Sequence, residues 1–371
     1  MDAPQVAAAP EPTMPAGMRR SWSRIEIVGM VLLVGTSALL FVNPKALGDF
    51  FDAAINEARP IIVDVFLTGY VGFAIIASVI AGRILERLGL TDALLRIFVP
   101  ILSRLGVNPT VAAPGVYNII GDINASGIIA GPVVQKSGAT IDEQKIAVAT
   151  MVQVQQSLAT FILGIVAVTA AGVWAFPVVL LAVFAPLFVV PFVLSKTLYR
   201  DVHPVELTEL PRFTPTGNLL EVLYDSAQEG VRLLLLVIIP AAGAFYAVVG
   251  ALKYLGIWQP FESAVSSVLS FALIDPVSGL QAIFVAPTLA MATLLESTGV
   301  PATHVVGSFV LASSGLPLSL IFGQIPLVWS QASDLSKAQA IEAAVVGMVL
   351  RVLTAVGIAA LSVVLIIQIQ A

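Results

Sequence analysis

Long runs of apolar residues recur along most of the chain and are separated by short polar segments. A helix needs roughly 17–25 such residues to cross the hydrocarbon core of a bilayer. Seven segments meet this length: residues 25–42, 60–81, 146–172, 176–194, 231–251, 305–329 and 338–369. Strands of outer-membrane barrels alternate apolar and polar residues instead. The pattern therefore predicts an all-α integral membrane protein with about seven full spans.

Two further segments carry polar residues at a helical period, and each precedes an apolar stretch that is broken in its middle. Residues 88–105 and 257–273 have the pattern of helices that lie in the membrane interface. The broken stretches that follow them are residues 109–136 and 276–297. Non-helical backbone at membrane depth is tolerated only inside protein or beside a cavity. We therefore expect two re-entrant helical hairpins.

Glycine and proline mark the turns of these hairpins. Gly121 and Gly127 flank the polar centre of the first, and Pro287 interrupts the second. The same order of elements thus occurs twice, and Leu88-Gly89 superposes on Leu255-Gly256 without a gap up to the start of each hairpin. The order predicts a duplicated unit.

Basic residues indicate how the chain is oriented, because cytoplasmic loops are enriched in lysine and arginine. With two hairpins and three spans per repeat, most basic residues, including Arg83, fall on the cytoplasmic face, and only Lys45, Arg59 and Lys253 fall outside. The repeats are then inverted. We expect a multi-pass protein of a bacterial cytoplasmic (inner) membrane with a cytoplasmic N-terminus and a periplasmic or extracellular C-terminus.

These observations divide the chain into five parts. They are a disordered cytoplasmic tail (1–24), an N-terminal transmembrane helix with an outer loop (25–56), repeat 1 (57–195), a cytoplasmic linker (196–218) and repeat 2 (219–371).

Composition limits the classes of protein and of functional site that the chain can form. The chain is 58% hydrophobic and 11% charged, which excludes soluble enzyme folds. It has no cysteine and only two distant histidines, so we expect no metal centre. No phosphate-binding loop, Ser/His pair or paired carboxylates at a common depth are present, so we expect no enzymatic activity, no cofactor and no nucleic-acid partner.

The tip of the first hairpin carries the strongest polar signal. Asp122, Asn124 and Ser126 lie between its two glycines. An intramembrane carboxylate is costly, so Asp122 is a candidate for binding a cation or carrying a coupling proton. The alternative is that these side chains cap the hairpin turn.

The span after this hairpin contains a polar stripe. Thr150, Gln153, Ser157 and Thr160 are spaced three, four and three residues apart, and Gln156 borders them. Such a stripe faces a solute-binding cavity, or it joins helices by hydrogen bonds.

In the second repeat, the corresponding span is interrupted at residues 313–317. Ser313, Ser314 and Gly315 precede Pro317, which cannot donate a helical hydrogen bond. Two facing broken helices would complete a central solute site.

Arg351 lies in the middle of the last span. A guanidinium at this depth needs a partner. The candidates are Asp122, an anionic group of the solute, Glu342 and a backbone carbonyl.

The arrangement of interfacial helix, hairpin, broken span and span resembles the nucleoside-recognition (Gate) domain membrane family, which includes concentrative nucleoside transporters and the gate regions of ferrous-iron transporters. The resemblance covers roughly residues 57–370, and three segments carry it: Gly121–Gly127, Gly131-Pro132 with Gly138-Ala139-Thr140, and Gln153–Ser157. It implies an elevator-type mechanism and a scaffold that also forms a homo-oligomer contact. The glutamates that hold ribose in nucleoside transporters are replaced here by glutamines and serines, and the cysteine expected of iron gates is absent.

We therefore expect a secondary transporter, coupled to Na⁺ or H⁺, that moves a small polar solute, nucleoside-like or other, with membrane lipid as its surroundings. A membrane assembly or signalling component of the same fold that moves no solute is the alternative, and a divalent-cation gate or permease is a further one.

Overall fold

The computed structural model describes residues 21–121, 123–203, 214 and 217–367. The chain forms two compact units, residues 1–52 and 53–371. The expected disordered tail lies largely outside the described residues.

The first unit contains α1 (Arg24–Val42). Ser23 begins this helix with a capping box, because its hydroxyl accepts from the Glu26 N–H and the Glu26 carboxylate accepts from the Ser23 N–H. The segment expected to form an outer loop up to residue 56 is largely helical, because it belongs to α2 (Pro44–Pro60). Pro44 suits a first helical turn, and the apolar residues that follow recur at helical spacing.

Three described helices are long and apolar enough to cross a membrane, and there are up to seven spans if each bent helix pair counts as one. The three are α1, the continuous rod Leu219–Tyr254 and α18 (Lys337–Ile367). This result and the all-helical architecture confirm the predicted fold class.

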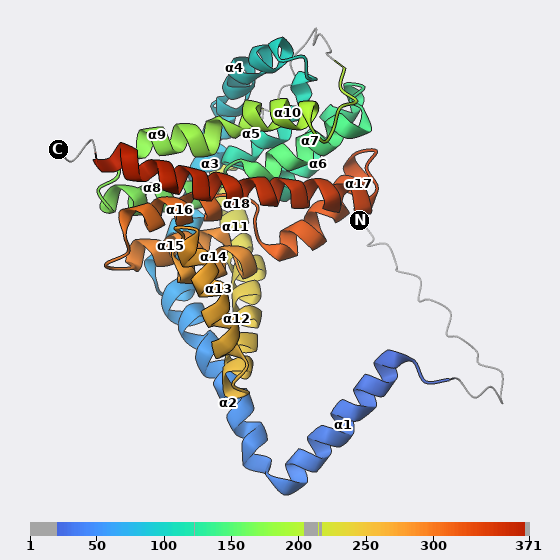
Figure 1. Ribbon diagram of the computed structural model, residues 1–371, viewed down its shortest axis with the longest axis vertical. Coiled ribbons are helices and arrows are strands. Elements are labelled where there is room, and N and C mark those ends of the chain that lie inside the picture. Colours follow the sequence, from blue (N-terminus) through green and yellow to red (C-terminus); the bar gives the residue numbers. More distant parts are fainter. Residues whose placement is uncertain (1–20, 122, 204–213, 215–216, 368–371) are drawn as a thin grey trace. The chain divides into compact units, whose positions relative to one another are not determined.

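Repeat 1 follows the predicted order (Figure 1). Its elements are η1 (Ile61–Leu67), α3 (Tyr70–Arg87), α4 (Leu90–Arg104), η2 (Pro109–Ala112), α5 (Ala113–Ile120), α6 (Ile123–Lys136), α7 (Ile141–Gln153), α8 (Leu158–Ala170), α9 (Ala175–Val179), η3 (Leu180–Phe184) and α10 (Pro186–Lys196). The interfacial helix is α4, and α5 packs on α6 as the first hairpin.

Repeat 2 has the same order. Its elements are α11 (Leu219–Leu233), η4 (Leu234–Ile238), α12 (Ile239–Tyr254), α13 (Trp258–Phe271), α14 (Pro276–Phe284), α15 (Pro287–Glu296), α16 (Ala302–Ala312), η5 (Leu320–Gln324), α17 (Ile325–Ala332) and α18. The second hairpin is α14 with α15, and its turn is at Ala286-Pro287 as predicted, because Pro287 begins α15 without needing a donor.

Gly127 does not lie in the turn of the first hairpin. Helix α5 ends at Ile120 with Gly121 as its C-cap, α6 begins at Ile123, and Gly127 is inside α6. A Cβ atom at Gly127 would come within 2.7 Å of Val328 and 3.0 Å of the Trp329 indole nitrogen. This glycine therefore permits α6 to approach α17 closely.

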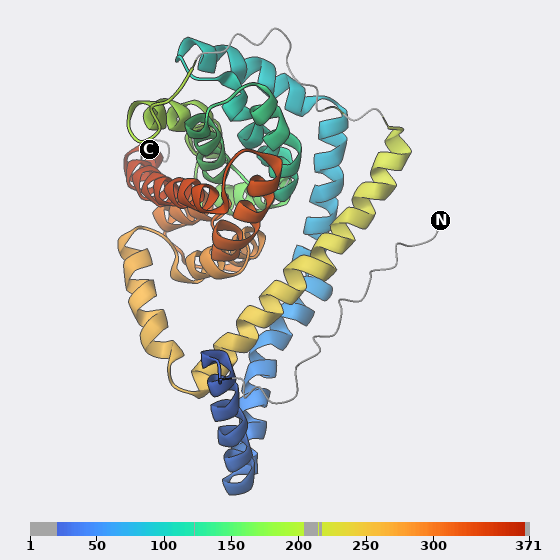
Figure 2. The ribbon, with the colours of Figure 1, turned by 90° about the vertical axis from the view of Figure 1, so that its right-hand side faces the viewer.

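The longest helices divide the second unit into two parts. The rod α11–η4–α12 lies alongside α3 and η1, and we call α3 with this rod the scaffold pair (Figure 2). Arg83 and Glu229 join its two members near one end, and Lys253 and Glu57 form an ion pair of 2.6 Å near the other. The two hairpins, α7–α8, α16–α17 and α18 pack on one another, and we call them the hairpin bundle.

Small residues allow α18 to pack closely on α7. Ala340, Ala344 and Gly347 recur at helical spacing and face the bundle. A Cβ atom at Gly347 would lie 2.7 Å from the carbonyl oxygen of Ala149. Gly357, in the same helix, has no atom within 4 Å of such a position.

We predict that Gly347→Ala and Gly357→Ala shift stability in opposite directions. Alanine at 357 is expected to add about 0.5–1 kcal/mol through its higher helix propensity, whereas alanine at 347 loses about 1–3 kcal/mol because α18 must move away from a backbone oxygen. Thermal unfolding of the purified variants measures both. Equal melting temperatures would contradict the close helix contact.

Candidate functional site

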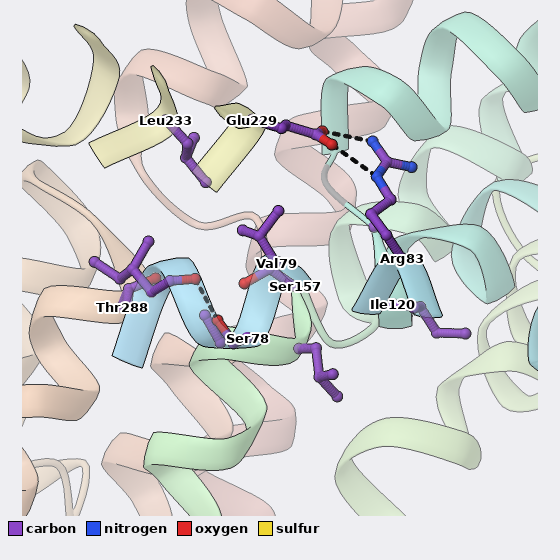
Figure 3. Close-up of a pocket in the computed structure, with 12 residues that line it drawn as sticks. Ser78, Val79, Arg83, Ile120, Ser157, Glu229, Leu233 and Thr288 are labelled. Carbon is purple, nitrogen blue, oxygen red and sulfur yellow. Dashed lines mark hydrogen bonds and ion pairs between the residues drawn. The ribbon is translucent and has the colours of Figure 1, made fainter. Parts of the chain in front are cut away.

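A cavity of about 50 Å³ lies between the hairpin bundle and the scaffold pair. The bundle supplies Ile120 and Gly121 from the first hairpin, residues 157–159 from the break between α7 and α8, and Thr288 from the second hairpin. The scaffold pair supplies Ile75, Ser78, Val79 and Arg83 from α3, and Glu229 and Leu233 from α11 (Figure 3). Both hairpin turns and one helix break therefore meet the scaffold at this point.

An ion pair forms the charged side of the cavity. The Arg83 guanidinium donates to both carboxylate oxygens of Glu229, through Nε at 2.8 Å and Nη2 at 2.5 Å (Figure 3). Its Nη1 donates to Glu86 at 2.8 Å and to the Tyr117 hydroxyl at 3.2 Å. Because Tyr117 belongs to α5, this last hydrogen bond connects the scaffold pair with the first hairpin.

Hydroxyl groups form another side of the cavity. Ser157 caps α8, and its hydroxyl lies 3.1 Å from that of Thr160. The Thr160 hydroxyl in turn lies 3.0 Å from that of Thr288. This chain joins the α7–α8 break to the turn of the second hairpin, and Ser157 and Thr288 both line the cavity.

The predicted stripe on a single helix is wrong, because the span is broken. Helix α7 ends at Gln153, α8 begins at Leu158, and the two are bent by 46°. The N–H groups that would continue α7 bond elsewhere: Gln156 donates to the Ser313 carbonyl at 2.7 Å, and Ser157 donates to the Asn118 carbonyl at 3.2 Å. Ser157 has φ of 59°, a conformation that ends a regular helix.

The two broken spans cross at this point, and Arg351 joins them. The guanidinium is fully buried and donates to the carbonyls of Gln153 and Ala182 and to the Ser313 hydroxyl. Among the described residues, the expected partner that is observed is a backbone carbonyl. Glu342 bonds instead to Lys145 at 2.9 Å. We call Gln153, Gln156, Ser313 and Arg351 the crossing.

The remaining residues predicted for the site have local roles. The Ser126 hydroxyl donates to the Pro114 carbonyl at 2.5 Å and joins the arms of the first hairpin. The Ser314 hydroxyl, just after the end of α16, donates to the Leu311 carbonyl at 3.2 Å. A Cβ atom at Gly315 would lie 2.2 Å from Ile123, so the second break approaches the first hairpin closely there. Asp122 lies outside the described residues, and Asn124 is described only by its backbone in α6.

Of the predicted site residues that the structure describes, only Gly121 and Ser157 line the cavity. Ser78, Arg83, Glu229 and Thr288 were missed. Arg83 had been placed on the cytoplasmic face, since a basic residue near the end of a span is usually solvated. The available signal is the pair of opposite charges just outside the ends of two predicted spans, residues 60–81 and 231–251.

Several buried oxygens beside the first break have no hydrogen-bond partner among the described residues. They are Asn118 Oδ1, Thr150 Oγ1, Gln155 Oε1 and Gln156 Oε1. Asn118 is fixed against the break, because its amide donates to the Met151 carbonyl at 3.1 Å. Buried polar atoms of this kind are normally hydrogen-bonded, so each of these oxygens is a candidate partner for a donor or a cation.

Comparison with solved structures finds proteins of similar fold. The chain superposes on CNTnw, a concentrative nucleoside transporter, in an inward-facing substrate-bound state with a TM-score of 0.59 and 14% identity over 92% of this chain and 87% of the other. A doubly substituted CNTnw variant in an outward-facing state gives a TM-score of 0.59 and 13% identity over 91% of this chain and 86% of the other. No protein-family model and no curated protein sequence matches.

The architecture is therefore that of concentrative nucleoside transporters. At this level of identity the similarity concerns the arrangement of helices, hairpins and breaks.

We predict that the ion pair stabilises the scaffold pair. Glu229→Gln keeps the size of the side chain but leaves Arg83 with one carboxylate, so the free energy of unfolding is expected to fall by roughly 1–2 kcal/mol. Glu221→Gln, on the exposed first turn of the same helix, is the matched control and is expected to change it by less than about 0.5 kcal/mol. Thermal unfolding compares them; indistinguishable variants would show that the pair is energetically neutral.

Proposed function

We propose that this protein is a secondary transporter that moves a small polar solute through the cavity between the hairpin bundle and the scaffold pair. One observation carries the proposal: both hairpin turns and the α7–α8 break meet the scaffold at a single cavity that combines hydroxyls, an ion pair and apolar walls. Pockets with apolar walls and a few converging polar groups are typical of small-molecule sites. The similarity to nucleoside transporters in two states supports this assignment.

Transport is proposed to occur by an elevator-type movement of the hairpin bundle against the scaffold pair. A volume of about 50 Å³ accommodates only a few water molecules. A solute therefore enters only when the bundle and scaffold separate. The hydrogen bond between Tyr117 and Arg83 is among the contacts that this movement breaks.

The proposed driving force is a Na⁺ or H⁺ gradient. The unpartnered oxygens of Asn118, Thr150, Gln155 and Gln156 suit a hard cation, because Na⁺ prefers carbonyl and hydroxyl ligands. Asp122 remains the proposed carboxylate for carrying a coupling proton or completing the cation site. The solute class stays open between nucleoside-like and other polar compounds.

The alternatives are less well supported by the cavity. A divalent-cation gate requires anionic ligands, and the described residues contain no group of three or more His, Asp or Glu side chains arranged for a metal ion. An assembly or signalling component of the same fold needs no cavity at the hairpin turns.

We also propose that the protein is a homo-oligomer embedded in the membrane.

A disulfide across the moving contact tests the elevator directly, since the chain contains no native cysteine. A Cβ atom at Gly82 in α3 would lie 3.8 Å from Cβ of Leu158 in α8, which is within the range for a disulfide. We predict that the double variant Gly82→Cys with Leu158→Cys loses nearly all uptake in proteoliposomes when oxidised and recovers it when reduced.

Each single cysteine variant is the control and is expected to transport equally under both conditions. Full uptake by the oxidised, cross-linked double variant would exclude the elevator movement but not transport by another route.

Thr288→Val tests the cavity as the solute site. The substitution removes a hydroxyl from the cavity at nearly constant volume, so uptake at low solute concentration is expected to fall roughly 3- to 10-fold, the value of one hydrogen bond. The assay measures proteoliposome uptake of radiolabelled nucleosides, amino acids and organic acids under imposed Na⁺ or H⁺ gradients. Thr169→Val, which changes an exposed hydroxyl in α8, is the control.

If no compound accumulates under either gradient while the protein is folded, the assembly or signalling alternative is favoured.

A further inference from the structure

A fully buried cation lies where the two broken spans cross. Arg351 has 0% exposure and belongs to the face of α18 that also carries Gly347 and Ala355. Within the described residues it forms no ion pair with a carboxylate, and it does not line the cavity. Among the described residues its charge is therefore compensated by neutral oxygen atoms.

Four oxygen atoms surround the guanidinium. Nη1 donates to the Gln153 carbonyl at 2.6 Å, to the Ala182 carbonyl at 2.8 Å and, more weakly, to Gln153 Oε1 at 3.4 Å. Nη2 donates to the Ser313 hydroxyl. The amide of Gln153 is itself oriented by donating to Thr354 at 3.0 Å, which turns its oxygen toward Arg351.

The breaks in the helices explain why these acceptors are free. Residue 186 is a proline, so the Ala182 carbonyl has no N–H four residues later to accept from. The Ser157 N–H, which would serve the Gln153 carbonyl in a continuous helix, donates to Asn118 instead. Gln153 is the last residue of α7 and Ser313 caps the C-terminus of α16. Both C-terminal ends carry partial negative charge.

We propose that Arg351 is a fixed internal cation that performs, at this crossing, the structural task of a bound monovalent metal ion. Carbonyl and hydroxyl oxygens released by unwound helices are a ligand set for Na⁺. In this chain the guanidinium occupies that ligand set permanently, neutralises the two half-helix ends and holds the breaks together. Removal of the side chain consequently leaves an oxygen-lined space that Na⁺ fills.

Thermal unfolding of the purified full-length protein in NaCl and in choline chloride at equal ionic strength tests this inference. Arg351→Ala is expected to unfold at a lower temperature than the wild type in choline, and to regain roughly 5–10 °C in saturating Na⁺ beyond any Na⁺ response of the wild type. Arg351→Met occupies the space without adding an oxygen, so it is expected to be destabilised without this regain. Arg351→Lys keeps a cation, so it is expected to lose less stability in choline than Arg351→Ala and to gain less from Na⁺.

Two results would overturn the inference: an Arg351→Ala protein no more responsive to Na⁺ than Arg351→Met, or an Arg351→Met protein as stable as the wild type in choline. If Arg351→Ala cannot be purified in choline, the monodisperse fraction recovered after solubilisation in each salt becomes the measurement, and equal loss in both contradicts the proposal. None of these measurements involves uptake, so their failure is distinguishable from failure of the proposed transport function.

Discussion

The structure depends on pairing the backbone groups that become free wherever a membrane helix is broken. Such a group costs several kcal/mol when it is left unpaired in apolar surroundings. Here the two breaks satisfy each other, because the Gln156 N–H donates to the Ser313 carbonyl and Arg351 donates to Gln153 and Ala182. Apolar packing alone gives little preference for one helix arrangement within lipid. The hydrogen bonds at the crossing therefore specify how the two repeats fit together.

The contact between the hairpin bundle and the scaffold pair has a different character. At the crossing a fully buried charge and backbone carbonyls are held by short hydrogen bonds. At the cavity, the hydrogen bonds between the bundle and α3 include the longer one between Tyr117 and Arg83, and both carboxylate partners of Arg83 lie within the scaffold pair. Separation of the bundle from the scaffold thus leaves no unpaired buried charge. This difference supports the proposal that the bundle moves against the scaffold at the cavity.

The parts of the fold that were predicted correctly are those with local causes. Hairpin turns follow from Gly121 and Pro287, and the interfacial helices follow from their amphipathic period. The position of the break after Gln153 has no local signal, because residues 154–157 contain no proline or glycine, and the unwound segment is stabilised by Asn118 and Ser313 from distant segments. Arg83 and Glu229 were missed for the same reason, since their pairing exists only after α3 packs on α11.

The proposed solute site has consequences that follow from where its polar groups are anchored. Ser157 and Thr288 belong to the hairpin bundle, whereas Arg83 and Glu229 belong to the scaffold pair. During an elevator movement the solute keeps its contacts with the first two residues and loses those with the second two. A guanidinium free to bind the solute strongly would hold it at the scaffold and oppose the movement. Glu229, Glu86 and Tyr117 occupy most of the donors of Arg83, so under the proposed mechanism the scaffold would contribute selectivity at the cavity without retaining the solute.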